Sequence, residues 1–99
     1  MKILALEKDV PGVADEQFGA HLHAEAQRVW DLYQSGVIRE MYFRADHPKA
    51  VLVLECKDDR EASEVLDSLP LARHGLIAFD RIPLVAYPGF ERLFAHTGT

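Results

Sequence analysis

Residues 36–71 read GVIREMYFRADHPKAVLVLECKDDREASEVLDSLPL, and this stretch decides the fold. Apolar and β-branched runs predict one strand over 37–44 and a second over 51–57, with the turn sequence Asp-His-Pro-Lys at 46–49 between them. The spacing of apolar residues then predicts a short helix over 60–68, which stops at the proline of a Leu-Pro-Leu element. We therefore expect a β-hairpin followed by a helix.

The segments on either side complete a recognisable order of elements. Residues 2–8 predict a short apolar strand, and a helix is expected from near Asp15 to Gly36, a glycine suited to a helix end. A last strand is expected over 76–84, followed by an apolar tail. The order β-α-β-β-α-β is that of a ferredoxin-like α+β fold, with one antiparallel sheet and two helices on one face. At 99 residues the chain fits a single domain, residues 1–99.

The composition indicates a globular protein from a reducing compartment. Hydrophobic residues make up 48% of the chain, which argues against disorder. The net charge of −5 and the scattered Lys and Arg argue against nucleic acid or an anionic membrane as a partner. The single cysteine, Cys56, excludes an intramolecular disulfide, and no apolar run approaches the roughly 20 residues that span a bilayer. We expect a soluble cytoplasmic protein.

The hairpin predicts a surface on which two subunits meet. With Ala45 opposite Ala50, the face toward the helices carries two apolar pairs, Met41–Leu54 and Phe43–Leu52. The opposite face then carries the pairs Tyr42–Val53, Arg44–Val51 and Glu40–Glu55, with Ile38 as a further candidate. Because this face is too apolar to be left in water, we expect a homodimer that packs sheet on sheet and encloses the two glutamates.

Residues 36–71 also resemble muconolactone isomerase without a gap. The shared residues are Gly36, Arg39, Ala45, His47, Val53, Glu61, Ala62, Leu66 and the Leu69-Pro70-Leu71 element. The resemblance continues more loosely to Ile77 and Asp80 and is weak before Gly36. It implies a dimeric α+β barrel that uses no metal or organic cofactor and shifts a proton on a small unsaturated lactone acid. At Glu40, Tyr42 and Arg44 the chain departs from that family, so the substrate does not carry over.

Glu40 and Glu55 are the candidate catalytic residues. Carboxylates directly opposite on neighbouring strands have Cβ atoms roughly 5 Å apart, and like charges in a partly dry space raise one pKa. Such a pair offers a base beside an acid and is suited to moving a proton across an unsaturated system. Tyr42 is the candidate donor to a developing enolate, and Arg44 the candidate partner of a substrate carboxylate. The alternative is a structural role, in which the glutamates form ion pairs with arginine or lysine across the dimer.

Arg39 and His21 are candidate substrate-binding residues. Arg39 is expected to project beside Met41 to the helix-covered face, where it needs a carboxylate such as Glu25 or a bound anion. His21 flanks the apolar stripe of the first helix, and either reaches a pocket between helix and sheet or is a half-buried surface residue. No His, Cys or Asp spacing resembles a metal site, and no cofactor is expected.

Three functions remain open from the sequence. The first is a cofactor-free, isomerase-like proton-transfer enzyme acting on a small unsaturated organic molecule, which we expect to be anionic. The second is a cofactor-independent monooxygenase-like barrel with Trp30, Tyr42 and His21 around its pocket. The third is a small-molecule-binding or accessory protein without chemistry.

Overall fold

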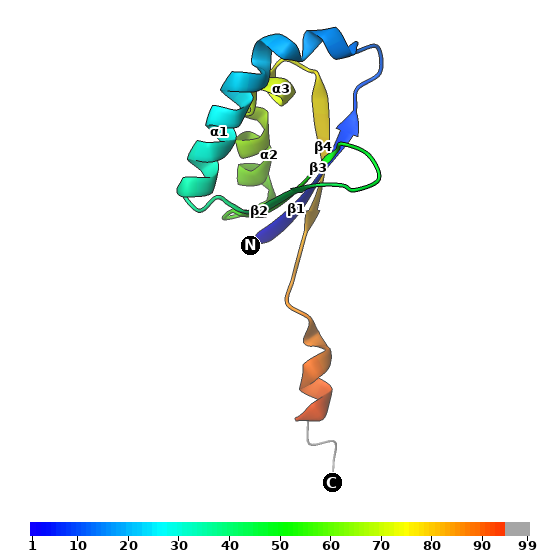
Figure 1. Cartoon of the computed structure of the whole chain (residues 1–99). Helices are drawn as coiled ribbons and strands as arrows, with labels where there is room; N and C mark the ends of the chain where they lie inside the picture. Colours follow the sequence, from blue (N-terminus) through cyan, green and yellow to red (C-terminus); the bar gives the residue numbers. More distant parts are fainter. Residues whose placement is uncertain (95–99) are drawn as a thin grey trace.

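A single four-stranded antiparallel sheet forms the base of the structure, a computed structural model that describes residues 1–94. The strands are β1 (Lys2–Asp9), β2 (Ile38–Phe43), β3 (Ala50–Glu55) and β4 (Ile77–Pro83), in the spatial order β2-β3-β1-β4. The first strand therefore lies in the interior of the sheet, between the hairpin and the last strand (Figure 1).

Three helices cover one face of this sheet: α1 (Leu22–Gln34), α2 (Asp59–Asp67) and the single-turn α3 (Pro70–Arg73) (Figure 1). The β-α-β-β-α-β order predicted from the sequence is thus confirmed, and the fold is a ferredoxin-like α+β fold. The regular part of the first helix begins later than predicted, because residues 15–21 form two short 3-10 turns instead.

The termini of the helices follow from their end residues. The side chain of Asp58 accepts a hydrogen bond from the N–H of Glu61 at 2.9 Å and so caps α2. Gly36 follows α1 with a φ of 84°, a left-handed conformation that favours glycine. Pro70 occupies the first position of α3, where its missing N–H costs nothing.

The core lies between the sheet and the helices. Its buried members are Ile3, Ala5, Leu32, Ile38, Leu52, Leu54, Cys56, Ala62, Leu66 and Leu69. Cys56, directly after β3, is buried among them, and burial raises the pKa of its thiol. No helix within residues 1–94 is both long and apolar enough to cross a membrane.

The register of the hairpin differs from the prediction by two residues. Tyr42 pairs with Val51 and Glu40 with Val53, because the connection runs over six residues and Phe43 pairs with Ala50 at its end. Since side chains alternate between the faces of a strand, a shift of two keeps Met41 and Tyr42 on their predicted faces. The shift means that Glu40 and Glu55 are no longer directly opposite. On the β2 side the N–H of Glu55 donates to the carbonyl of Val37, and on the β1 side Glu55 pairs with Lys2.

A β-bulge interrupts β2 at Arg39. Ile38 pairs with Leu54 while Glu40 pairs with Val53, so Arg39 has no partner across the strands. Because of the extra residue, the side chain of Ile38 points into the core, where it is 1% exposed, and Arg39 is left exposed. The expectation that Ile38 faces outward and Arg39 faces the helices is therefore wrong.

The face of the sheet away from the helices, which we call the open face, has an apolar centre with charged residues around it: Lys2, Lys8, Glu40, Glu55 and Asp80. Its apolar members, which come from all four strands, are Leu4, Leu6, Tyr42, Val51, Val53 and Ile82. Beyond β4, residues 85–94 form an arm that points away from the sheet and contains the 3-10 helix Pro88–Leu93 (Figure 1). The arm exposes five large hydrophobic side chains: Val85, Tyr87, Phe90, Leu93 and Phe94.

Candidate functional site

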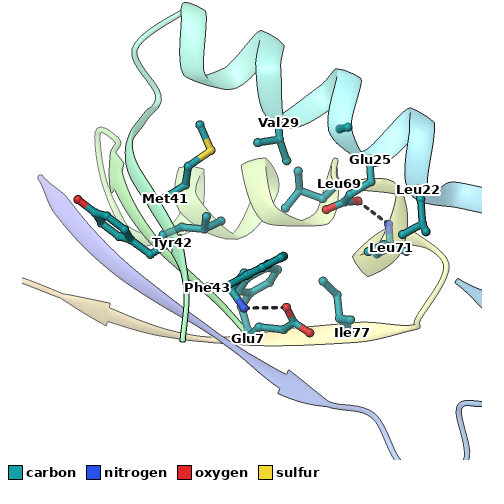
Figure 2. A pocket seen from close by; sticks show the side chains of 14 residues that line it. Glu7, Leu22, Glu25, Val29, Met41, Tyr42, Phe43, Leu69, Leu71 and Ile77 are labelled. Carbon is teal, nitrogen blue, oxygen red and sulfur yellow. Dashed lines mark hydrogen bonds between the residues drawn. The ribbon is translucent and has the colours of Figure 1, made fainter. Parts of the chain in front are cut away.

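A cavity of about 460 Å³ lies between α1 and the helix-covered face of the sheet (Figure 2). Its lining is mostly apolar and includes Leu22 and Val29 from α1, Met41 and Leu52 from the hairpin, and Leu71 and Ile77. Phe43, which is 72% exposed, lies at the edge of the cavity rather than in the core. A cavity of this size and lining is typical of a site for a small organic molecule.

Glu25 enters the cavity from α1. It lies three residues after Leu22 and four before Val29, which places its carboxylate on the apolar side of the helix. Its Oε1 atom accepts a hydrogen bond from the backbone N–H of Leu71 at 2.9 Å. Leu71 is in the first turn of α3, where backbone N–H groups have no partner within the helix.

The pKa of Glu25 is raised above its usual range. Burial in the apolar cavity is the main cause, because it disfavours the charged form. The hydrogen bond from Leu71 acts in the opposite direction, and the charge of Glu7 adds to the increase. The protonated form of Glu25 is therefore favoured more than in a glutamate exposed to water.

Glu7 reaches the same cavity from the sheet. It shares the helix-covered face of β1 with Ile3 and Ala5, since every second residue of a strand points to the same side. Its Oε1 atom accepts a hydrogen bond from the backbone N–H of Ala50 at 2.9 Å. Figure 2 shows the Glu7 and Glu25 side chains entering the cavity from the sheet and from the helix.

The predicted catalytic pair does not form across the hairpin. Glu40 lies opposite Val53 and accepts a hydrogen bond from the hydroxyl of Tyr42 at 2.9 Å, which raises the pKa of that hydroxyl. Glu55 forms an ion pair with the amino group of Met1 at 2.7 Å. This contact lowers the pKa of Glu55, whereas the predicted pair required one raised pKa. Neither glutamate lines the cavity, and their catalytic role stays a prediction.

The predicted binding residues also lie apart from one another. Arg39 is exposed and donates from Nε to the carbonyl of Gly36 at 2.6 Å rather than to Glu25, and the alternative of a bound anion at Arg39 stays a prediction. Arg44 forms a two-point contact with Asp46, at 2.9 and 2.5 Å. The ring of His21 stacks on that of His74, with their centroids 4.1 Å apart, and is not among the residues that line the cavity. Of the four predicted binding residues, only Tyr42 borders the cavity.

Two residues that the sequence analysis did not select as catalytic, Glu7 and Glu25, are the carboxylates of this cavity. A signal for each was present in the sequence. Glu25 interrupts the apolar stripe of its helix, and Glu7 has the same parity as the buried Ile3 and Ala5. Within residues 1–94 we find no group of three or more His, Cys, Asp or Glu side chains arranged to hold a metal.

Comparison with known proteins supports the fold. No family model matches the chain, and no curated protein sequence matches it. Among solved structures it is similar to 5-chloro-2-hydroxyhydroquinone dehydrochlorinase (TftG) from Burkholderia phenoliruptrix AC1100, determined in complex with 2,5-dihydroxybenzoquinone. The TM-score is 0.67 at 17% sequence identity, and the match covers 90% of this chain and 98% of that one. At this identity the match establishes a shared α+β fold.

Proposed function

We propose that the protein is a cofactor-independent proton-transfer enzyme that acts on a small unsaturated organic molecule in the cavity beneath α1. Glu25 and Glu7 form its acid–base pair, in place of the Glu40 and Glu55 expected from the sequence. The observation that carries this proposal is the carboxyl of Glu25, whose pKa is raised inside an apolar cavity that also contains Glu7. Perturbed carboxyls in such cavities are typical of catalytic sites.

The two carboxyl groups divide the work. The protonated carboxyl of Glu25 donates a hydrogen bond to the carbonyl oxygen of the substrate and stabilises the enolate that develops there. The carboxylate of Glu7 removes a proton from the carbon next to that carbonyl. The proton returns at the far end of the conjugated system, the double bond moves by one position, and the product is an isomer of the substrate.

Two comparisons support this class of reaction. The resemblance of residues 36–71 to muconolactone isomerase favours an isomerisation by proton shift. The structural neighbour is named as a dehydrochlorinase of a hydroxyhydroquinone and holds a quinone. Removing HCl from an organic molecule also requires the removal of a proton, so both reactions need a positioned base.

A monooxygenase-like reaction has less support. It was expected to use a pocket bordered by Trp30, Tyr42 and His21, but only Tyr42 borders this cavity. If ligands bind in the cavity but no proton is transferred to or from them, the protein has a binding or accessory role.

The test is the conversion of α-angelica lactone, an uncharged β,γ-unsaturated lactone, to its conjugated isomer. The same assay is run with a carboxymethyl analogue, in which a carboxymethyl group replaces the ring methyl. Absorbance of the conjugated product and deuterium uptake in D₂O report the proton shift. We expect Glu25→Gln and Glu7→Gln each to slow the reaction by at least about 100-fold, while Glu16→Gln, an exposed control, leaves the rate unchanged. Absence of enzyme-dependent deuterium uptake in both lactones would overturn the proposal.

We also propose that the protein forms a homodimer through the open face, which completes an α+β barrel. Two observations support this. The open face carries apolar side chains from all four strands, and the arm formed by residues 85–94 exposes five large hydrophobic side chains, among them Val85 at 88%. Soluble monomers rarely leave large apolar surfaces of this kind in water. The mass of the full chain in solution, measured by sedimentation velocity, tests this proposal.

A further inference from the structure

The charge of the cavity beneath α1 has a consequence for the substrate. Glu7 and Glu25 are the charged residues among those that line it, and none of the described lining residues is Lys, Arg or His. The sequence-based expectation of an anionic substrate relied on Arg44 or Arg39 as the cation. Both lie outside this cavity, with Arg44 bound to Asp46 and Arg39 to the carbonyl of Gly36.

Other cations near the hairpin and helix are engaged elsewhere. Lys49 lies outside the lining of the cavity and forms an ion pair with Asp9 on β1; this hydrogen bond is the main cause of its raised pKa, to which the charge of Glu7 adds. The Nε atom of Arg28 on α1 donates to the hydroxyl of Ser68 at 3.0 Å. Within residues 1–94, therefore, the cavity contains no side chain that can neutralise a carboxylate brought in by a ligand. A buried charge without such a partner is costly.

The hydrogen bonds that the two glutamates already make further restrict which chemical groups of a ligand can contact them. Each uses Oε1 to accept a backbone N–H, from Leu71 in the case of Glu25 and from Ala50 in the case of Glu7. No donor in the described part of the chain reaches the Oε2 atom of either residue. A ligand can supply a hydroxyl or an acidic C–H to the carboxylate of Glu7, or a carbonyl to the protonated carboxyl of Glu25, whereas a ligand carboxylate placed beside Glu7 is repelled.

We infer that the cavity selects an uncharged, unsaturated carbonyl compound or hydroxylated ring, and that it excludes carboxylated relatives of the same molecule. This inference rests on the site of the proposed function and narrows its substrate class. It also separates the protein from the lactone acid that the resemblance to muconolactone isomerase implies. The discrimination comes from the carboxylate of Glu7, to which Glu25 adds once the pH exceeds its raised pKa, so it should weaken when the charge of Glu7 is removed.

The experiment compares ligands that differ by one carboxylate, independently of turnover. Binding of γ-valerolactone, a saturated and unreactive lactone, and of its carboxymethyl analogue is followed by NMR titration of the full-length protein. For the natural sequence we expect the uncharged lactone to bind at least about tenfold more tightly, since one like-charge contact at about 4 Å changes affinity by about fivefold in bulk water and by more near a protein surface. The difference should shrink as salt is added, because salt screens the repulsion.

Variants identify the source of the discrimination. In the double variant Glu7→Gln with Glu25→Gln, the ratio of the two affinities should fall by about tenfold, because the carboxymethyl lactone is no longer repelled. Glu7→Gln alone should show most of this change, which keeps the test usable if the double variant folds poorly. Glu16→Gln, an exposed control, should leave both affinities unchanged.

The possible outcomes separate this inference from the proposed function. Equal or tighter binding of the carboxymethyl lactone to the natural sequence overturns the inference, even if proton transfer is observed. Preferential binding of the uncharged lactone that depends on Glu7 and Glu25 supports the inference, even if neither unsaturated lactone takes up deuterium.

Discussion

The carboxylate of Glu25 on α1 accepts a hydrogen bond from the backbone N–H of Leu71, 2.9 Å away and 46 residues later in the chain. This contact joins the first helix to α3, and it fixes a carboxyl group at the wall of an apolar cavity. The same burial that makes the group useful for proton transfer makes its charged form unfavourable.

The first prediction concerns stability. Because the folded-state pKa of Glu25 is raised above its usual value of 4.5, the group contributes most to stability below that value. Its contribution is lost as the pH rises through the folded-state pKa. Glu25→Gln keeps an oxygen for the Leu71 N–H and removes the charge. We expect the stability of this variant, relative to the natural sequence, to increase between acid and neutral pH.

Thermal unfolding of the two proteins at matched pH values measures this difference. Carboxyl groups remote from the cavity have the same surroundings in both proteins, so their effects cancel in the comparison. A stability difference that does not change with pH would show that the carboxyl of Glu25 titrates as in the unfolded chain.

The second prediction concerns the pH dependence of lactone isomerisation. The reaction requires Glu25 as the acid, so kcat/KM should fall as the pH rises through the raised pKa of Glu25. In Glu25→Gln this alkaline decrease should disappear, together with most of the rate. An alkaline decrease that persists unchanged in the variant would assign it to a different group.

The third prediction concerns the dimer. Val53 lies on the open face between Leu4 and Glu40, so a charge at this position meets the partner sheet of the proposed dimer. Val53→Glu should therefore yield a folded monomer in sedimentation velocity at micromolar concentration, while the natural sequence sediments as a dimer. Ala24→Glu, which adds the same charge at an exposed position of α1, should leave the dimer intact. A natural sequence that sediments as a monomer would contradict the proposed assembly.

The fourth prediction concerns the start of α2. Asp58 caps this helix through the N–H of Glu61, and Asp58→Ala removes the acceptor. We expect a loss of about 1 kcal/mol in the free energy of unfolding. Denaturation by urea measures it, with Lys57→Ala as a neighbouring exposed control that should stay within about 0.5 kcal/mol. Equal effects of the two substitutions would indicate that the cap contributes nothing specific.

The fold could be predicted from the sequence because local signals agree with one another. The apolar stripe of α1, the turn at 46–49 and the proline after α2 each mark an element or its end. The predicted faces of Met41 and Tyr42 are correct despite an error of two residues in register, since side chains alternate between the faces with a period of two. The bulge at Arg39 was not predictable, because nothing in the local sequence distinguishes an extra residue from a regular one.

The site was harder to predict, since its two carboxylates come from distant segments. Glu40 and Glu55 lie in one hairpin, where the residues that face each other across the strands can be predicted from the length of the turn. Glu7 and Glu25 meet the same cavity only after α1 packs against the sheet, and no spacing in the sequence reports that packing. The sequence does show that Glu7 lies an even number of residues after Ile3, and so on the same face of the strand. It also shows that Glu25 lies within the apolar stripe of its helix.

The last prediction decides between the two pairs of glutamates. If the cavity beneath α1 is the site, Glu25→Gln and Glu7→Gln should each slow lactone isomerisation by at least about 100-fold, whereas Glu40→Gln and Glu55→Gln should leave kcat/KM unchanged. The reason is positional: Glu40 is bonded to Tyr42 on the open face, and Glu55 to the amino group of Met1. Glu40 lies on the open face, which is the interface of the proposed dimer. Sedimentation of all four variants therefore distinguishes a loss of catalysis from a loss of dimerisation. Loss of activity in Glu40→Gln with an intact dimer, together with full activity in Glu25→Gln, would move the site to the interface between the sheets.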